Sequence, residues 1–243
     1  MLVVEAISKS FGGFLAVNRV SFEVAKGEIL GLIGPNGSGK STLFNLISGT
    51  YPPTGGVVRF EGRDITALPP NRICHLGIAR TFQIPRPFRK LSLLENVTLA
   101  AYYGDDLLWS KTEAEHRARQ ALDLVGLPSD RQAPVAGLGA ASLKKLELAR
   151  ALATQPRLLL ADESLGGLDH KEMDQAAAML TRIRGELGIT IVWVEHIMGV
   201  LMKVVDRVMV LDYGEKIAEG SPAEVARDPK VIEVYLGDRS VGG

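Results

Sequence analysis

The sequence has almost no cysteine, no excess of either charge and no long apolar run. Its single cysteine, Cys74, excludes an internal disulfide and a cysteine-based metal site. Lys+Arg and Asp+Glu both number 28, so no overall positive charge points to nucleic acid. Apolar runs stay far below the roughly 20 residues of a membrane helix. The start, Met1–Ala6, lacks the features of a signal peptide. We therefore expect membrane contact only through partners.

The pattern of apolar residues predicts a parallel α/β core. Short apolar segments broken by Gly and Pro predict early strands at Val20–Val24, Ile29–Ile33 and Val57–Phe60, and helical spacing follows from Lys40 to Ser48. After Pro156, strands and helices alternate: Leu158–Ala161, Lys171–Glu186, Thr190–Val194, Met198–Val205 and Arg207–Leu211. Such alternation is typical of parallel sheets.

The middle of the chain differs, because charged helical patterns replace strand signals. We interpret 91–150 as an inserted helical subdomain within one domain spanning 1–243, whose core comes from 1–90 and 151–243. The tail predicts a hairpin at 212–220 and two short helices within Pro222–Leu236.

A glycine-rich loop lies between a predicted strand and a predicted helix, as a phosphate-binding P-loop requires. Its glycines let backbone N–H groups curl around phosphates, Lys40 adds a point charge, and the Ser41 hydroxyl suits Mg²⁺. A glycine-rich turn that only looks like a P-loop is the alternative. The predicted ATP-binding residues are Gly34, Pro35, Asn36, Gly37, Ser38, Gly39, Lys40, Ser41 and Thr42.

Two acids, Asp162 and Glu163, follow the apolar run Leu158–Ala161. An Asp at the carboxyl end of a strand can hold Mg²⁺, and the next acid can polarise an attacking water. We assign Asp162 to the metal and Glu163 to the water; two solvated acids at a strand end are the simpler alternative. His196 also follows a predicted strand, and is either structural or a hydrogen-bond donor to the γ-phosphate or the attacking water.

Together with Gln83 after Ala79-Arg-Thr-Phe and Asp169 after Ser164-Leu-Gly-Gly-Leu, these motifs resemble the nucleotide-binding subunit of ABC transporters along nearly the whole chain. The resemblance implies an ABC cassette with a parallel-sheet core, an N-terminal antiparallel β subdomain and a helical insertion. It implies that Gln83 touches Mg²⁺ and water and signals to membrane subunits. By the same resemblance Asp169 is the D-loop acid, His196 the switch histidine, and Phe11 the aromatic under adenine.

Finer features look like the ATPases of branched-chain amino-acid importers: Ala79–Gln83, Val194–Met198 and Asp228–Gly237. Lipopolysaccharide-export ATPases share parts of this ending. The resemblance implies ATP hydrolysis with Mg²⁺ at the cytoplasmic face of a membrane, with permease subunits and, indirectly, an external substrate-binding protein. We expect Ile84–Lys90, a basic and proline-rich segment, either to dock a permease helix or to be a solvated loop.

The family's signature loop, L-S-G-G-Q, reads Leu138-Gly-Ala-Ala-Ser142 here. The serine is replaced by Gly139, and the Cβ atoms of Ala140 and Ala141 hinder close backbone approach. Ser142 is either the N-cap of the next helix or a weaker phosphate contact. Because the resemblance pairs each ATP with the partner's signature loop, we expect a heterodimer with a sister ATPase.

A P-loop kinase and a regulatory ABC protein are the two alternative classes of protein. A P-loop kinase shares the phosphate loop but has no reason to carry Gln83, Asp169 and His196. A regulatory ABC protein of repair or translation usually has two cassettes in one chain, whereas this chain has one.

Overall fold

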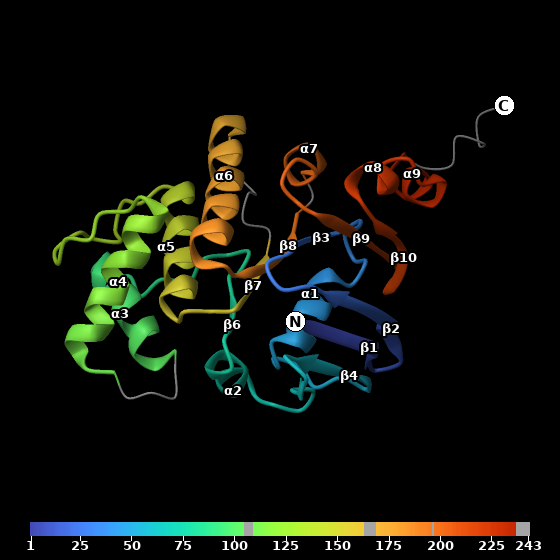
Figure 1. The fold of residues 1–243 in the computed structure, drawn as a ribbon, viewed down its shortest axis with the longest axis horizontal. Coiled ribbons are helices and arrows are strands. Elements are labelled where there is room, and N and C mark those ends of the chain that lie inside the picture. The colour runs from blue at the N-terminus through green and yellow to red at the C-terminus, as the bar shows by residue number, and fades with distance from the viewer. Residues whose placement is uncertain (105–108, 163–168, 196, 237–243) are drawn as a thin grey trace. The chain divides into compact units, whose positions relative to one another are not determined.

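The computed structural model describes residues 1–104, 109–162, 169–195 and 197–236 (Figure 1). They form two compact units. The first unit comprises Met1–Pro69 together with the chain from Thr190 onward, and the second comprises Pro70–Ile189. In the described residues no helix is both long enough and apolar enough to span a bilayer.

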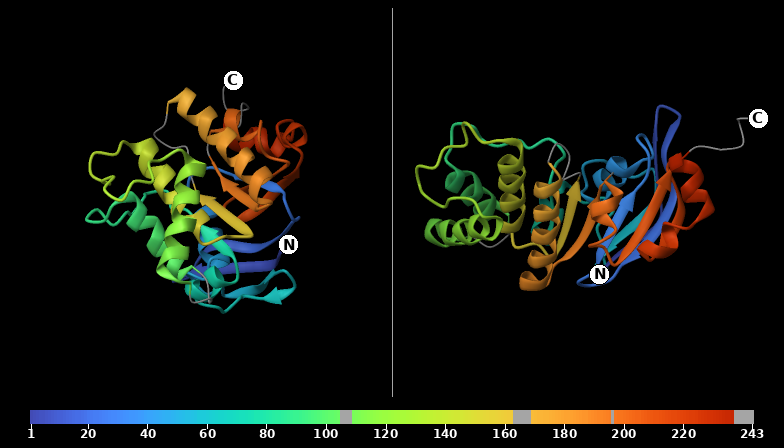
Figure 2. Two further views of the ribbon diagram at one scale, coloured as in Figure 1. Left: turned by 60° about the vertical axis from the view of Figure 1, so that its left-hand side comes forward. Right: turned by 90° about the horizontal axis from the view of Figure 1, so that it is seen from above.

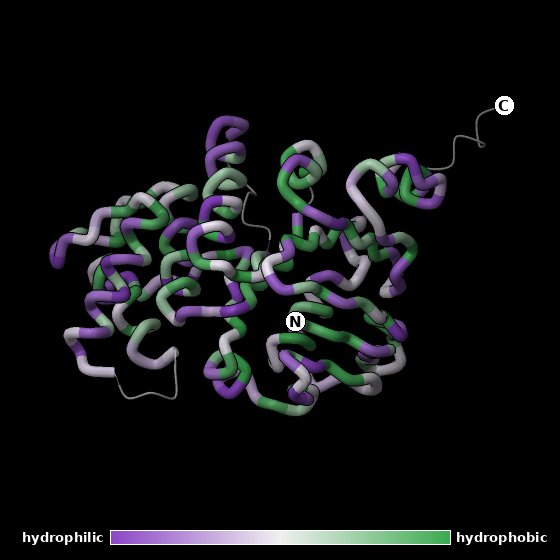
Figure 3. The backbone as a smooth tube through the Cα atoms, viewed as in Figure 1, coloured by the Kyte–Doolittle hydropathy of each residue, from purple (hydrophilic) through white to green (hydrophobic). Residues whose placement is uncertain are grey.

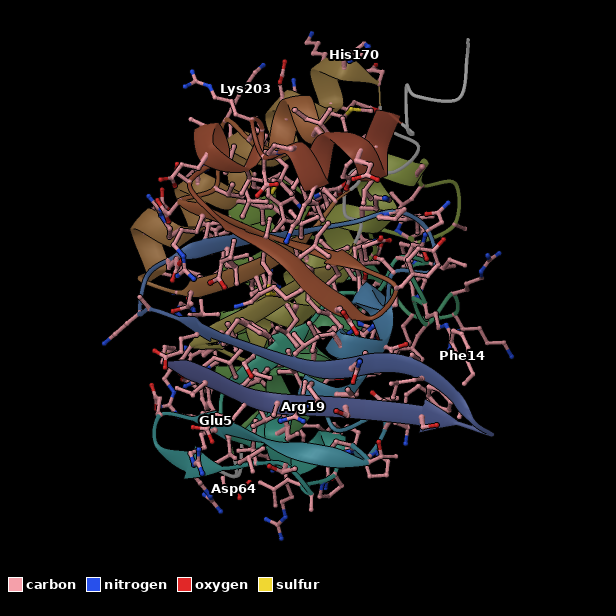
Figure 4. The ribbon with its side chains drawn as sticks, turned by 90° about the vertical axis from the view of Figure 1, so that its right-hand side faces the viewer. Glu5, Phe14, Arg19, Asp64, His170 and Lys203 are labelled. Carbon is pink, nitrogen blue, oxygen red and sulfur yellow. The ribbon has the colours of Figure 1, made fainter. Side chains whose placement is uncertain are left out.

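An antiparallel sheet begins the first unit, in the strand order β2-β1-β4-β5. Its strands are β1 (Leu2–Phe11), β2 (Phe14–Val24), β4 (Gly55–Phe60) and β5 (Arg63–Asp64). Figure 4 shows Phe14 at the far end of the β1–β2 hairpin, where its side chain is 68% exposed. The predicted antiparallel subdomain is confirmed, although β1 itself was not predicted.

The other sheet of the first unit contains the strand order β10-β9-β3-β8. Strand β3 pairs in parallel with β8 and with β9, and β10 returns antiparallel to β9. Every residue of β3 and β8 is buried, as expected for strands covered on both faces. Figure 3 shows hydrophobic residues along the strands of this unit. The strands are β3 (Ile29–Ile33), β8 (Thr190–Val194), β9 (Arg207–Asp212) and β10 (Glu215–Gly220).

Short helices complete the first unit. Helix α7 ends at Leu201 rather than at the predicted Val205, because turns follow from Met202. The two predicted C-terminal helices are present, and Ser221 starts the first with a capping box to Glu224. The helices are α1 (Lys40–Ile47), α7 (Met198–Leu201), α8 (Pro222–Val225) and α9 (Pro229–Leu236).

The second unit is mostly helical, with β6 (Ile78–Arg80) paired in parallel with β7 (Leu158–Asp162). Helices α3, α4 and α5 pack against one another, and both views of Figure 2 show them side by side. The helices are α2 (Pro70–His75), α3 (Leu93–Tyr103), α4 (Lys111–Val125), α5 (Ala140–Ala153) and α6 (His170–Leu187).

Candidate active site

The loop between β3 and α1 requires glycine at two crowded positions. Gly34 has a φ of +152°, and a Cβ there would come 2.1 Å from the carbonyl oxygen of Leu211. Gly39 has a φ of +103°, and its Cβ would come 2.6 Å from the carbonyl oxygen of Ala16. L-residues rarely adopt such a φ. The loop therefore approaches β9 and β2 too closely for any side chain.

The loop curls around the ammonium group of Lys40. Its Nζ donates to the carbonyl oxygens of Gly34, at 2.8 Å, and Pro35, at 2.9 Å. The Oγ of Ser38 lies 3.5 Å away, and Lys40 is only 6% exposed. A cation held this way at the inner side of the loop supplies the point charge that a phosphate site needs.

The N-terminus of α1 is open to an anion. Its N-cap, Gly39, provides no side-chain hydrogen bond, and the first turn contains no acidic residue. The backbone N–H groups of this turn and the positive end of the helix dipole therefore favour a phosphate. Ser41 and Asn36 are exposed here, and Thr42 is partly exposed.

Phe11 ends β1 and is 41% exposed. Tyr51 meets its ring edge-on, with centroids 5.4 Å apart and an interplanar angle of 79°. The Lys9 ammonium lies 5.1 Å from the Phe11 centroid and donates to the Pro52 carbonyl at 2.6 Å. These contacts fix the ring that sequence reasoning assigned to adenine. Sequence reasoning missed Tyr51, whose proximity only the fold reveals.

Tyr235 on α9 is a second residue that the sequence did not reveal. Burial raises the pKa of its hydroxyl group, and hydrogen bonding with the Gly34 backbone opposes that shift. Helix α9 also packs against β10. The C-terminal helix thus contacts the first glycine of the phosphate loop.

In the second unit, Asp162 ends β7 and is 4% exposed. Its Oδ2 accepts a hydrogen bond from the Arg80 guanidinium at 2.8 Å. The backbone N–H of Asp162 donates to the Oγ1 of Thr81 at 3.1 Å. Its Oδ1 is buried without a hydrogen-bond partner in the described part of the chain. An unsatisfied, buried carboxylate oxygen is a suitable acceptor for a metal or its water.

Gln83 is exposed shortly after β6, and the segment that follows is held by two helices. Asn96 of α3 is fully buried; its Oδ1 accepts from the Phe88 N–H at 2.8 Å and its Nδ2 donates to the Phe88 carbonyl at 3.0 Å. Arg150 of α5 donates to the Arg86 carbonyl at 3.0 Å. The segment therefore has a defined shape despite its two prolines, Pro85 and Pro87.

Asp169 is the N-cap of α6. Its Oδ1 accepts from the Glu172 N–H at 2.8 Å, and the Glu172 side chain accepts from the Asp169 N–H at 3.0 Å. This capping box satisfies backbone donors at the helix start. Glu163 and His196 lie outside the described residues, so their assigned roles stay predictions.

The degenerate signature loop leads into α5, and the first of the two roles predicted for Ser142, the N-cap of this helix, is wrong. The helix begins at Ala140, with Gly139 as an N-cap that makes no side-chain hydrogen bond. Gly139 is extended, with φ −70° and ψ 170°, and its carbonyl accepts from the Leu143 N–H at 3.0 Å. Ser142 therefore lies inside the first turn.

Two family models match the chain. One, described as ABC transporter, covers residues 17–166, and a second, described as branched-chain amino acid ATP-binding cassette transporter, covers residues 215–240. The chain belongs to the ABC transporter family. The second match includes Tyr235 and the described residues of α9.

Relatives of this ABC ATPase match over almost their full length. The chain is 34% identical to the high-affinity branched-chain amino acid transport ATP-binding protein BraF of Pseudomonas aeruginosa, covering 98% of both chains. It is 38% identical to a probable branched-chain amino acid transport ATP-binding protein, LivG, of Archaeoglobus fulgidus, covering 98% of this chain and 95% of that one.

A solved structure shares the fold of this cassette. The ADP conformation of an ATP-binding cassette from an ABC transporter superposes with a TM-score of 0.87 at 33% identity, covering 98% of this chain and 99% of that one. Both the ABC fold and the binding of a nucleotide within this family are therefore established by comparison.

The crowding at Gly34 gives a test of the phosphate loop. We expect Gly34→Ala to lower the free energy of unfolding by about 3 kcal/mol or more and to abolish binding of a fluorescent ATP analogue, because the loop must move away from Leu211. Gly37→Ala is the matched control: its φ is +82° but no atom lies within 4 Å of the added Cβ. That variant should lose only about 1–2 kcal/mol. Equal losses in urea unfolding would contradict this view of the loop.

Proposed function

We propose that this chain binds ATP with Mg²⁺ and hydrolyses it to power an importer of branched-chain amino acids or similar amides. The observation that carries the proposal is the phosphate loop wrapped around Lys40, in a chain matched along its length by branched-chain amino acid transport ATPases. The loop supports the proposed binding of phosphates, and the names of the relatives support the proposed role in amino-acid import.

In the proposed reaction, backbone N–H groups of residues 34–42 and the Lys40 ammonium hold the phosphates, and Phe11 stacks on adenine. Ser41, Gln83 and Asp162 would hold Mg²⁺, which when bound neutralises charge on the phosphates. The fit rests on oxygen donors, including the buried Oδ1 of Asp162. Asp169 remains a predicted contact to the nucleotide site.

Glu163 takes the proton of the attacking water in this proposal, and His196 donates a hydrogen bond to the γ-phosphate or to that water. Glu163 directly follows β7 in the sequence, and His196 follows β8 with only Glu195 between them. Glu163 is required for turnover in this proposal but does not hold the nucleotide.

We expect Glu163→Gln to lower ATP turnover by roughly 10²- to 10⁴-fold, because a general base is lost, while ATP binding is retained. Turnover would be measured by phosphate release and binding by a fluorescent ATP analogue. Asp174→Asn is the control, since it removes the same charge from an exposed position on α6. Normal turnover in Glu163→Gln would show that the base is misassigned.

The segment Ile84–Lys90 is the proposed docking surface for a permease subunit at the cytoplasmic face of the membrane. Phe88 is 50% exposed and Ile84 is 70% exposed, although both are large apolar side chains. Asn96 and Arg150 hold this segment in place, so it presents a preformed surface. Aromatic side chains at such positions often dominate binding energy.

We expect Phe88→Ala to weaken co-purification with the permease subunits roughly tenfold after detergent extraction, because an aromatic anchor is removed. ATP binding by the isolated chain should not change. Leu187→Ala is the control, since Leu187 is 45% exposed but lies at the end of α6, outside the segment. Retention of the permeases by Phe88→Ala would exclude this docking surface.

The signature loop supports a heterodimer with a sister ATPase. Ala140 and Ala141 occupy the first turn of α5, where the family pattern has glycines. In a pair of cassettes, this loop serves the ATP held by the partner. The intact phosphate loop of this chain would then meet a normal signature from the sister chain.

We expect the purified chain alone to bind MgATP but to hydrolyse it slowly, since a homodimer combines good phosphate sites with poor signatures. A variant with Gly139→Ser, Ala140→Gly and Ala141→Gly should hydrolyse ATP faster alone, as measured by phosphate release. Fast hydrolysis by the unaltered chain without a partner would overturn the heterodimer proposal.

A further inference from the structure

The ion pair between Arg80 and Asp162 places a permanent cation at the predicted metal-binding acid. The guanidinium Nη2 lies 2.8 Å from Oδ2, and the two side chains are only 10% and 5% exposed. Arginine stays protonated in proteins, so this charge is present at every working pH. Sequence reasoning gave Arg80 no role.

The backbone fixes this geometry on both sides. Arg80 lies opposite Leu160 in the parallel register of β6 and β7. The next residue, Thr81, donates its N–H to the Leu160 carbonyl at 3.0 Å and accepts from the Asp162 N–H at 3.1 Å. The Arg80 guanidinium also lies 5.0 Å from the centroid of the Phe82 ring. The guanidinium and the carboxylate therefore face each other from rigid positions.

The two oxygens of the Asp162 carboxylate are in different situations. Oδ2 is engaged by Arg80, whereas Oδ1 is buried and has no hydrogen-bond partner among residues that the structure describes. A buried carboxylate costs several kcal/mol unless it is paired, so Arg80 compensates the charge when no metal is bound. The same compensation lowers the attraction of Asp162 for any other cation.

We propose that Arg80 is a specificity-determining, positioning residue: it neutralises Asp162 so that Mg²⁺ binds well only together with the phosphates of a nucleotide. The inference rests on the proposed function, because it presumes that Asp162 faces the metal. Free Mg²⁺ would meet a carboxylate whose charge is already balanced. The phosphates of a bound nucleotide add negative charge and so raise the affinity of the site for Mg²⁺.

The test measures the Mg²⁺ concentration at which binding of a fluorescent ADP analogue to the full chain is half enhanced. Arg80→Gln removes the charge but keeps a hydrogen-bond donor. We expect the half-saturating Mg²⁺ concentration to fall by about tenfold, because the repulsion between the guanidinium and the metal is gone. Arg80→Lys keeps the charge and should stay within about twofold of the unaltered chain. Thr81→Val removes only the uncharged contact to Asp162, so the half-saturating Mg²⁺ concentration should also stay unchanged.

An unchanged Mg²⁺ dependence in folded Arg80→Gln, or a rise, would overturn the inference. If Arg80→Gln does not fold, Arg80→Ala replaces it, since it also removes the charge and should lower the half-saturating Mg²⁺ concentration about tenfold. A tenfold change in Arg80→Lys would overturn the inference, because the shape of the guanidinium would then matter rather than its charge. The unaltered chain separates this from the proposed function. If it binds no ADP analogue with or without Mg²⁺, the proposed function fails; if it binds but Arg80→Gln behaves identically, only the role of Arg80 fails.

Discussion

The candidate site depends on a backbone constraint at the phosphate loop. Gly34 and Gly39 adopt conformations that other residues rarely reach, and each lies against a carbonyl oxygen of a neighbouring strand. In this conformation the carbonyl groups of Gly34 and Pro35 accept hydrogen bonds from the Lys40 ammonium. The parallel strands β3, β8 and β9 serve as the rigid support for this loop.

In the second unit, the main constraint is the burial of the Asp162 carboxylate, which is predicted to bind Mg²⁺. The Asp162 carboxylate is balanced by Arg80 from the adjacent strand, and Thr81 fixes its backbone. Gln83 follows Arg80 and Thr81 closely in the sequence, so the residues that contact Asp162 and the predicted glutamine belong to one segment of chain. Asn96 and Arg150 hydrogen-bond to the backbone of the next residues, the segment proposed to dock a permease.

The sequence predicted the elements whose signal is local. Strands β3 and β8 have the predicted bounds because their residues are uniformly apolar and buried. Strand β1 escaped prediction because polar residues such as Glu5 and Lys9 interrupt its apolar pattern. Helix α7 was predicted too long, since apolar spacing continues to Val205 through residues that form turns.

The site was predictable to the same degree. The phosphate-loop motif could be recognised because glycine, lysine and serine occur at fixed spacing, and the role of these residues in binding stays a prediction. Tyr51, Arg80 and Tyr235 were given no role, since their importance comes from partners that are distant in sequence. The N-cap role considered for Ser142 is wrong because spacing alone does not show whether α5 begins after Gly139 or after Ser142.

The contact between Tyr235 and Gly34 has a thermodynamic consequence. It joins the helix matched by the branched-chain amino acid cassette model to the loop that is proposed to hold the phosphates. Linkage is reciprocal: a partner that binds α9 only while this contact is formed stabilises the nucleotide-ready loop, and nucleotide strengthens that partner's binding equally. Through this contact, a partner bound to α9 would change the affinity for nucleotide without touching the phosphate loop.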